Sequence, residues 1–159
     1  MITTCDRRAV ASGLFIAAAA LTAGAAGAAA PLRLAMTVYK DANCGCCTAW
    51  VERLRADGRF AAKVVNTPDL AGIKRRLGVP GDLAACHTGI VAGYLIEGHV
   101  PPADIARFVA ARPRGLRGLA VPGMPAGSPG METQDGSREP FEVIAFGARD
   151  TRRVFARHG

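Results

Sequence analysis

The sequence predicts an α/β domain of the thioredoxin-like class, with the element order β-α-β-α-β-β-α and an added C-terminal β-hairpin. Short runs rich in β-branched residues alternate with segments of helical periodicity. A cluster of cysteines lies between the first expected strand and the first expected helix. The order of elements indicates a fold by analogy only, so the function has to be argued from the residues of the site.

The first 28 residues have the features of a secretory signal peptide. A short polar start ends at Arg7-Arg8, an apolar run follows, and a small-residue stretch ends in an A-x-A pattern. Cleavage after Ala28 would leave one domain, residues 29–159, in the periplasm, exported by the Sec route or by the Tat route that twin arginines allow. The apolar run is shorter than the roughly 20 residues that span a bilayer, so we expect no membrane association after cleavage.

Two strands and two helices are expected in the first half of this domain. Alternating apolar residues predict a strand at 33–40, and the sequence AAKVVNT predicts a second strand. The first helix runs from Cys46 to the stop at Gly58. The second helix covers 67–78, with Thr67 as its N-cap. The residues that recur at helical spacing in the first helix are Cys47, Trp50, Val51 and Leu54.

The second half is expected to hold two short strands, a helix, a loop and a hairpin. The strands are expected at 87–91 and 94–97, around a glycine turn. The helix covers 101–113, and residues 118–132, GLAVPGMPAGSPGME, read as an irregular Gly/Pro loop. The last segment, 141–157, is expected to form the terminal hairpin. The helix residues expected to face inward are Ile105, Phe108 and Val109.

Charge and motif content exclude several classes of function. The formal net charge is +7, but the arginines are dispersed and no basic run alternates with aromatic residues. This pattern does not indicate nucleic-acid binding. The sequence shows no Ser/His/Asp set, no paired catalytic carboxylates and no phosphate-binding glycine loop. It therefore favours a non-enzymatic metal-binding protein.

The stretch Cys44-Gly45-Cys46-Cys47 places three thiols in four positions. The outer pair has the C-x-x-C spacing of a redox-active dithiol, but the extra thiol at Cys46 does not fit that motif. Neighbouring cysteines cannot pair without strain, so the plausible bridges are Cys44–Cys47 or a bridge from Cys86 to one of the three. A helix N-terminus stabilises thiolates, and a dense thiolate set selects Cu(I), Zn(II) or similar soft ions.

Cys86 lies just before the expected strand at 87–91, at the position where thioredoxin-like enzymes carry a cis-proline. In such a fold the four thiols would converge. Glu97 is expected to face solvent, and His158 to be a solvated tail residue. Secondary candidates for metal contact, each with an alternative structural role in packing or hydrogen bonding, are His87, His99, Met124 and Met131.

Three segments together resemble the family of exported, CopG-like copper-binding proteins, long catalogued as a domain of unknown function. These segments are CGCC, CHTGIVAGYLIEGHVP and GLAVPGMPAGSPGME, and the resemblance covers residues 36–132. It implies a thioredoxin-like fold and a link to copper homeostasis and resistance, and it favours copper over zinc. The thiolate ligands that it implies are Cys44, Cys46, Cys47 and Cys86.

Three hypotheses of function follow. In the first, a periplasmic protein binds Cu(I) through the four cysteines and passes electrons or metal to a periplasmic copper efflux or redox protein. In the second, the protein is a thiol–disulfide oxidoreductase with Cys44 as nucleophile and Cys47 as resolving thiol. In the third, it is a copper metallochaperone that docks on its partner through the PGMPAGSPGM loop.

Overall fold

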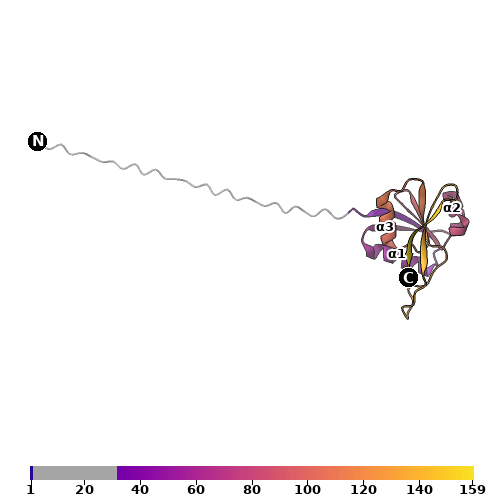
Figure 1. The fold of residues 1–159 in the computed structure, drawn as a ribbon. Helices are drawn as coiled ribbons and strands as arrows, with labels where there is room; N and C mark the ends of the chain where they lie inside the picture. The colour runs from indigo at the N-terminus through magenta and orange to yellow at the C-terminus, as the bar shows by residue number, and fades with distance from the viewer. Residues whose placement is uncertain (2–31) are drawn as a thin grey trace. The chain divides into compact units, whose positions relative to one another are not determined.

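The computed structural model describes Met1 and residues 32–159, and the latter build a seven-stranded sheet with three α-helices (Figure 1). The α/β class is therefore confirmed. The predicted signal peptide and its cleavage site fall outside the described residues. Among the described residues, no helix combines the length and the apolar character needed to cross a membrane.

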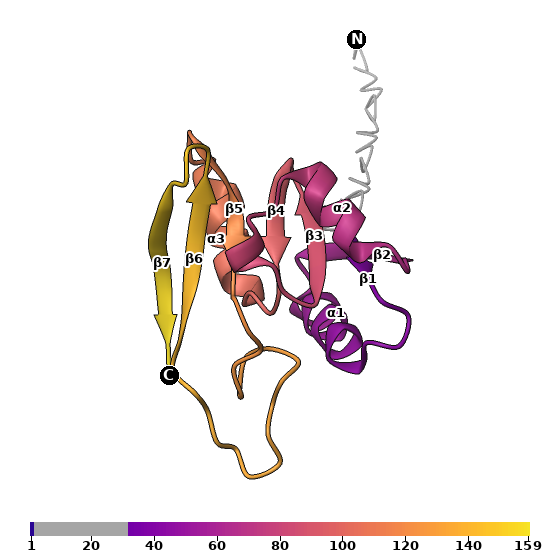
Figure 2. The same cartoon turned by 90° about the vertical axis from the view of Figure 1, so that its right-hand side faces the viewer.

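The strands lie in the order β2-β1-β3-β4-β5-β6-β7 across the sheet (Figure 2). The neighbours β1/β2 and β4/β5 are parallel, and all other neighbouring pairs are antiparallel. The strand bounds are β1 Leu34–Lys40, β2 Phe60–Asn66, β3 His87–Val91, β4 Tyr94–Glu97, β5 Leu116–Ala120, β6 Phe141–Gly147 and β7 Arg152–His158.

The helices cover the two faces of the sheet unequally. Their bounds are α1 Gly45–Asp57, α2 Leu70–Leu77 and α3 Pro102–Ala111, with a short 3-10 turn, η1, at Gly81–Leu83. The main core joins α1 and α3 to one face through residues such as Trp50, Leu54 and Phe108. A smaller cluster on the other face gathers Leu83 and Phe146, with Leu77 of α2 packed against it. The inward faces predicted for α1 and α3 are confirmed, because all of their predicted residues are buried.

The predicted start of α2 is wrong by two residues. Asp69, not Thr67, is the N-cap, and its carboxylate accepts a hydrogen bond from the Gly72 N–H at 2.8 Å. The Thr67 hydroxyl oxygen instead accepts from the Asp69 N–H at 3.1 Å. This local turn competes with the helix for the backbone, as threonine side chains often do, and keeps residues 67–69 out of it.

Strand β5 lies where the sequence predicted the start of an irregular loop. Gly118 faces Leu95 of β4 in parallel register, and a Cβ at Gly118 would clash with the Leu95 carbonyl oxygen. The glycine thus permits close packing of two strands rather than a turn. The apolar residues that follow Gly118, Leu119 and Ala120, are fully buried. This apolar run was the sequence signal for a strand.

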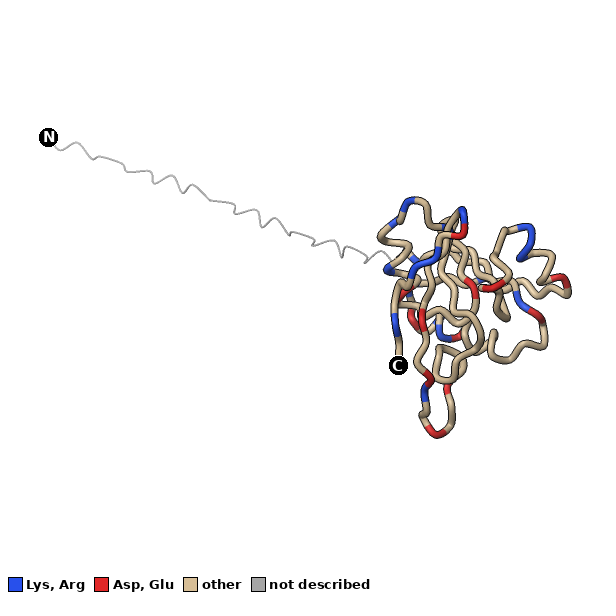
Figure 3. Tube along the Cα trace, turned by 45° about the vertical axis from the view of Figure 1, so that its right-hand side comes forward, with Lys and Arg blue, Asp and Glu red and all other residues tan. Residues whose placement is uncertain are grey.

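The C-terminal strand, β7, lies at one edge of the sheet and carries several charged residues. His158, expected as a solvated tail residue, is the last residue of β7, and its Nε2 lies 2.6 Å from the Asp104 carboxylate on α3. Lys and Arg residues are distributed over several elements of the described chain, and acidic residues are interspersed among them (Figure 3).

Candidate metal centre

The CGCC motif forms the N-terminal turn of α1. Cys44 is the N-cap, and the Cys47 N–H donates to its sulfur at 3.4 Å. Cys47 begins the buried face of the helix and is fully buried. Cys44 and Cys47 form a disulfide with a Cα–Cα distance of 5.4 Å. Cys46 remains free, with its sulfur 3.5 Å from that of Cys44.

Cys86 reaches the same place from a segment far away in the sequence. Antiparallel pairing of β1 with β3 sets Lys40 opposite His87, so the start of β3 lies beside the end of β1 and the motif that follows it. The carbonyl oxygen of Cys86 lies 3.5 Å from the Cys47 sulfur. The sulfurs of the four cysteines lie within 4.8 Å of one another. They form a group that can hold a metal ion once the disulfide is reduced.

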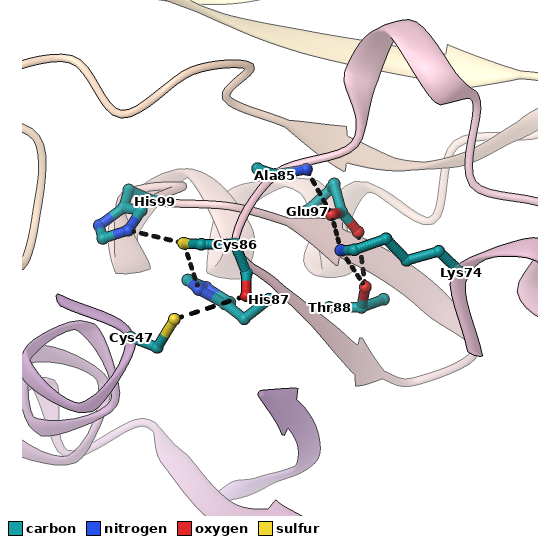
Figure 4. Close-up of polar contacts among 8 residues, drawn as sticks. All are labelled: Cys47, Lys74, Ala85, Cys86, His87, Thr88, Glu97 and His99. Carbon is teal, nitrogen blue, oxygen red and sulfur yellow. Dashed lines mark hydrogen bonds and ion pairs between the residues drawn. The ribbon is translucent and has the colours of Figure 1, made fainter. Parts of the chain in front are cut away.

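Two histidines flank the Cys86 sulfur (Figure 4). His99 Nε2 lies 3.1 Å from it, and His87 Nδ1 lies 3.3 Å from it. The other ring nitrogen of His99 donates to the Pro129 carbonyl oxygen at 2.8 Å, so the lone pair of Nε2 points toward Cys86. Cys86, His87 and His99 form a second possible ligand group within 4.8 Å, and Cys86 belongs to both groups.

Burial controls the protonation of this centre. Burial, and next the neighbouring Cys46 thiol, raise the pKa of Cys86 to about 12, so the free protein keeps it as a thiol. Burial, and next the charges of His99 and Lys74, lower the pKa of His87 to about 3. The pKa of His99 is also lowered by burial. Both imidazoles are therefore neutral near pH 7, which is the form that binds metals.

The ring of His87 packs on Trp50. The two ring centroids are 4.2 Å apart, and the Trp50 indole N–H donates to the Val100 carbonyl oxygen at 2.9 Å. His87 Nε2 is buried and has no hydrogen-bond partner among the described residues. Buried polar atoms usually have a partner, so the unpaired Nε2 beside the cysteines is consistent with a site that binds a further group, such as a metal ion.

The segment between β5 and β6 brings one of the two methionines to the cysteines. Met124 is 51 % exposed, and its thioether sulfur lies 4.0 Å from the Cys46 sulfur. Met131 closes a turn with its backbone: its carbonyl oxygen accepts from Gly127 N–H, and its own N–H donates to Ser128. Within residues 32–159 its sulfur makes no hydrogen-bonding contact with the cysteines. Of the two methionine candidates, Met124 is therefore the one whose sulfur lies beside the cysteines.

The expectation that Glu97 faces solvent is wrong. Its side chain is fully buried and accepts hydrogen bonds from Lys74, Ala85 and Thr88. The sequence contained a signal for this burial. Leu95 points to the same face of β4, because alternate residues of a strand share a face, and it is only 6 % exposed.

Comparison with known proteins finds one family model and two solved structures that are similar to this chain. A family model described as a protein of unknown function, DUF411, matches residues 83–131. A solved structure of a copper resistance protein, CopG form 2, shares 41% sequence identity and a TM-score of 0.75, covering 80% of this chain and 100% of that one. Form 1 of the same protein shares 42% identity and a TM-score of 0.74, covering 80% and 98%. The chain belongs to the CopG family.

The family model covers part of the centre of this CopG-family chain. Residues 83–131 include Cys86, both histidines and both methionines, but not the CGCC motif. The two solved CopG structures cover most of the chain. A search of the curated proteins finds no match.

Proposed function

We propose that this protein binds Cu(I) in the periplasm through Cys44, Cys46, Cys47 and Cys86, as part of copper homeostasis or resistance. The observation that carries the proposal is the convergence of four sulfurs within 4.8 Å from two segments distant in sequence. Reduction of the Cys44–Cys47 disulfide by an external dithiol, which is itself oxidised to a disulfide, would convert the two bonded sulfurs into two thiols.

The chemistry of the donors supports copper as the metal. Thiolates and thioethers are soft ligands that prefer Cu(I), and neutral imidazole suits copper as well. Four cysteine sulfurs, a thioether and two neutral histidines lie together here. Both solved relatives carry the name copper resistance protein, which favours copper over zinc. Bound copper would supply one-electron redox chemistry to the site.

The protein's own residues prepare the site for a metal. Cys86 has to lose its proton to become a ligand, and burial keeps that proton on the sulfur of the free protein. His99 Nε2, 3.1 Å away with its lone pair directed at the sulfur, accepts a hydrogen bond from the Cys86 thiol, and the thiol proton would pass to solvent when a metal ion binds. The Pro129 carbonyl oxygen holds the opposite ring nitrogen and so fixes the orientation of the imidazole.

An anaerobic Cu(I) titration of the reduced protein, in competition with a chromophoric chelator, tests this proposal. We expect tight uptake of at least one Cu(I), weakened at least about tenfold by Cys46→Ser, since a thiolate ligand is lost. Met131→Leu is the matched control, because within residues 32–159 the Met131 sulfur makes no hydrogen-bonding contact with the cysteines, whereas the Met124 sulfur does. Weak uptake that is insensitive to Cys46→Ser would contradict copper binding by the cluster.

The disulfide favours a second candidate, a thiol–disulfide oxidoreductase. Cys44 and Cys47 are bridged at the N-terminus of α1, where the helix dipole stabilises an attacking thiolate, and Cys47 is buried as a resolving thiol would be. Such an enzyme has no need of Cys46. Insulin reduction by metal-free protein that survives Cys46→Ser would therefore support this candidate.

We also infer a thioredoxin-like domain within residues 29–159. The parallel β1/β2 pair, the antiparallel β1/β3 and β3/β4 pairs and the sheet order β2-β1-β3-β4 support it. In this interpretation β5 and the segment after it are an addition, and β6 and β7, which pair antiparallel, form its terminal hairpin.

A further inference from the structure

We propose that Glu97, together with Lys74 and Thr88, is a positioning residue that holds Cys86 and His87 in the geometry of the metal centre. The consequence for copper rests on the proposed function. The effect on the placement of the Cys86 sulfur does not, and it can be measured without any metal.

The Glu97 carboxylate holds the chain on both sides of Cys86-His87. One oxygen accepts from the Ala85 N–H at 2.7 Å and from the Lys74 ammonium, and the other accepts from the Thr88 hydroxyl at 2.7 Å. Ala85 directly precedes Cys86, and Thr88 directly follows His87. Figure 4 shows these contacts on one side of the segment and the Cys86 sulfur with His99 on the other.

The Ala85 N–H lies outside the ladder of the sheet, because β3 begins at His87. Without Glu97 this half-buried stretch of backbone would lose a charge-assisted hydrogen bond. Lys74 comes from α2 and also donates to the Thr88 hydroxyl oxygen at 2.8 Å. The network therefore ties α2, β4 and the start of β3 to one carboxylate.

A buried ion pair is a costly way to stabilise a fold. The Lys74 side chain is 12% exposed and that of Glu97 0%, so both charges are largely removed from water. Apolar residues of similar size would often stabilise such a position as well or better. The location of the pair, directly behind two side chains of the metal centre, points to a role in fixing their placement.

A small displacement of Cys86 would change the geometry of both possible ligand groups. Its sulfur is shared by the four-cysteine group and by the group with His87 and His99. A ligand group holds its geometry when the residues behind it are locked by packing and hydrogen bonds. Release of Ala85 and Thr88 would loosen both groups together.

Alkylation of Cys86 in metal-free protein tests the placement directly. In a Cys5→Ser/Cys46→Ser background with the Cys44–Cys47 disulfide intact, Cys86 is the single free thiol. We expect Glu97→Gln to speed its reaction with iodoacetamide about tenfold, because the 85–88 segment loses hydrogen bonds that hold it and opens more often. Thr88→Val keeps the side-chain shape, removes one hydrogen bond and should change the rate in the same direction.

Asp104→Asn is the matched control. Asp104 is another buried carboxylate, 5% exposed, and it contacts Arg107 at 3.0 Å and His158 at 2.6 Å rather than the 85–88 segment. Its loss should lower the stability to urea without changing the Cys86 rate. In the wild-type cysteine background, Glu97→Gln should also weaken Cu(I) binding about tenfold, and Asp104→Asn should not.

Two results would overturn the inference: an unchanged Cys86 rate in both Glu97→Gln and Thr88→Val, or an equal acceleration in Asp104→Asn at equal loss of stability. If Glu97→Gln does not fold, as judged by circular dichroism, Thr88→Val decides alone. If the wild-type protein binds no Cu(I), the proposed function fails, whereas the alkylation rates still decide whether Glu97 positions Cys86.

Discussion

The thioether of Met124 stands at the solvent-facing side of the cysteine cluster. Its sulfur lies 4.0 Å from the Cys46 sulfur, although the residue is 51 % exposed. Exposed apolar side chains of this size are ordinary when single, but this one is also a soft ligand beside free Cys46. This position would allow the Met124 thioether to contribute to the Cu(I) binding proposed above.

Met124→Leu should lower the affinity for Cu(I) a few-fold, because it removes one soft donor and keeps the apolar volume. Competition with a chromophoric chelator measures the change. Met131→Leu is the paired variant, and it should leave the affinity unchanged. Equal effects of the two substitutions would show that the position of the Met124 sulfur has no bearing on binding.

Among single residues, the sequence predicted that the four cysteines lie together, but it did not predict the hydrogen bonds around them. Three thiols in four positions mark a site whatever the fold, and Cys86 followed from the expected order of elements. The hydrogen bond from His99 to Pro129 joins residues 30 positions apart. Formation of the disulfide depends on the redox state as well as on the spacing of the cysteines. The Glu97 side chain can be buried only because three donors bind its carboxylate. Contacts of this kind follow from tertiary packing and leave little trace in local pattern.

At the scale of elements, the segment between β5 and β6 is fitted closely to the first turn of α1. Gly130 has φ +86°, and a Cβ there would lie 2.6 Å from the Trp50 backbone nitrogen and 3.0 Å from the Cys46 carbonyl oxygen. An ion pair of 2.8 Å between Arg53 and Glu132 adds a second contact between the segment and the helix. This contact holds the Pro129 carbonyl oxygen at His99.

Gly130→Ala should therefore lift the segment from α1 and weaken Cu(I) binding, in addition to the cost of a positive φ. Gly136→Ala is the matched control, since Gly136 also has a positive φ, +73°, but nothing lies within 4 Å of its Cβ position. We expect both variants to lose about 1 kcal/mol of unfolding free energy from backbone strain, with a larger loss and weaker binding only in Gly130→Ala. Urea denaturation and chelator competition measure the two quantities. Identical behaviour of the two variants would contradict the close fit.

The elements that the sequence predicted best are those whose pattern is set by the core. Periodicity identified α1 and α3 because each buries one face. The start of α2 was missed because a side-chain turn at Thr67 competes with the helix, and β5 was missed because Gly118 serves close strand packing. In both cases local residue preferences indicated a different structure from the one that tertiary contacts select.

At the scale of the whole molecule, the buried His87 links stability to pH. Burial, then the charges of His99 and Lys74, lower the pKa of His87 to about 3 from its ordinary value of 6.5. Between these pH values the unfolded chain binds a proton that the folded chain does not. The contribution to folding stability is therefore complete above about pH 6.5 and decreases as the pH falls toward 3.

Metal-free, oxidised protein should accordingly lose unfolding free energy between pH 7 and pH 5, and His87→Gln should lose less of it over the same interval. Urea denaturation at the two pH values measures the difference. A chelator in both samples keeps metal binding out of the comparison. The same pH dependence in the variant and the wild type would show that His87 does not make this contribution.

The pairing of β1 with β3 also sets an order of events during folding. Cys47 and Cys86 are 39 residues apart, and only the completed pairing brings them together. A newly made chain that has not yet folded presents three thiols in four consecutive positions, while Cys86 and His99 are still elsewhere. Closing this long-range contact is slower than forming a local turn. An ion captured before folding would meet only those three thiols, and the remaining donors would arrive around it as the sheet forms.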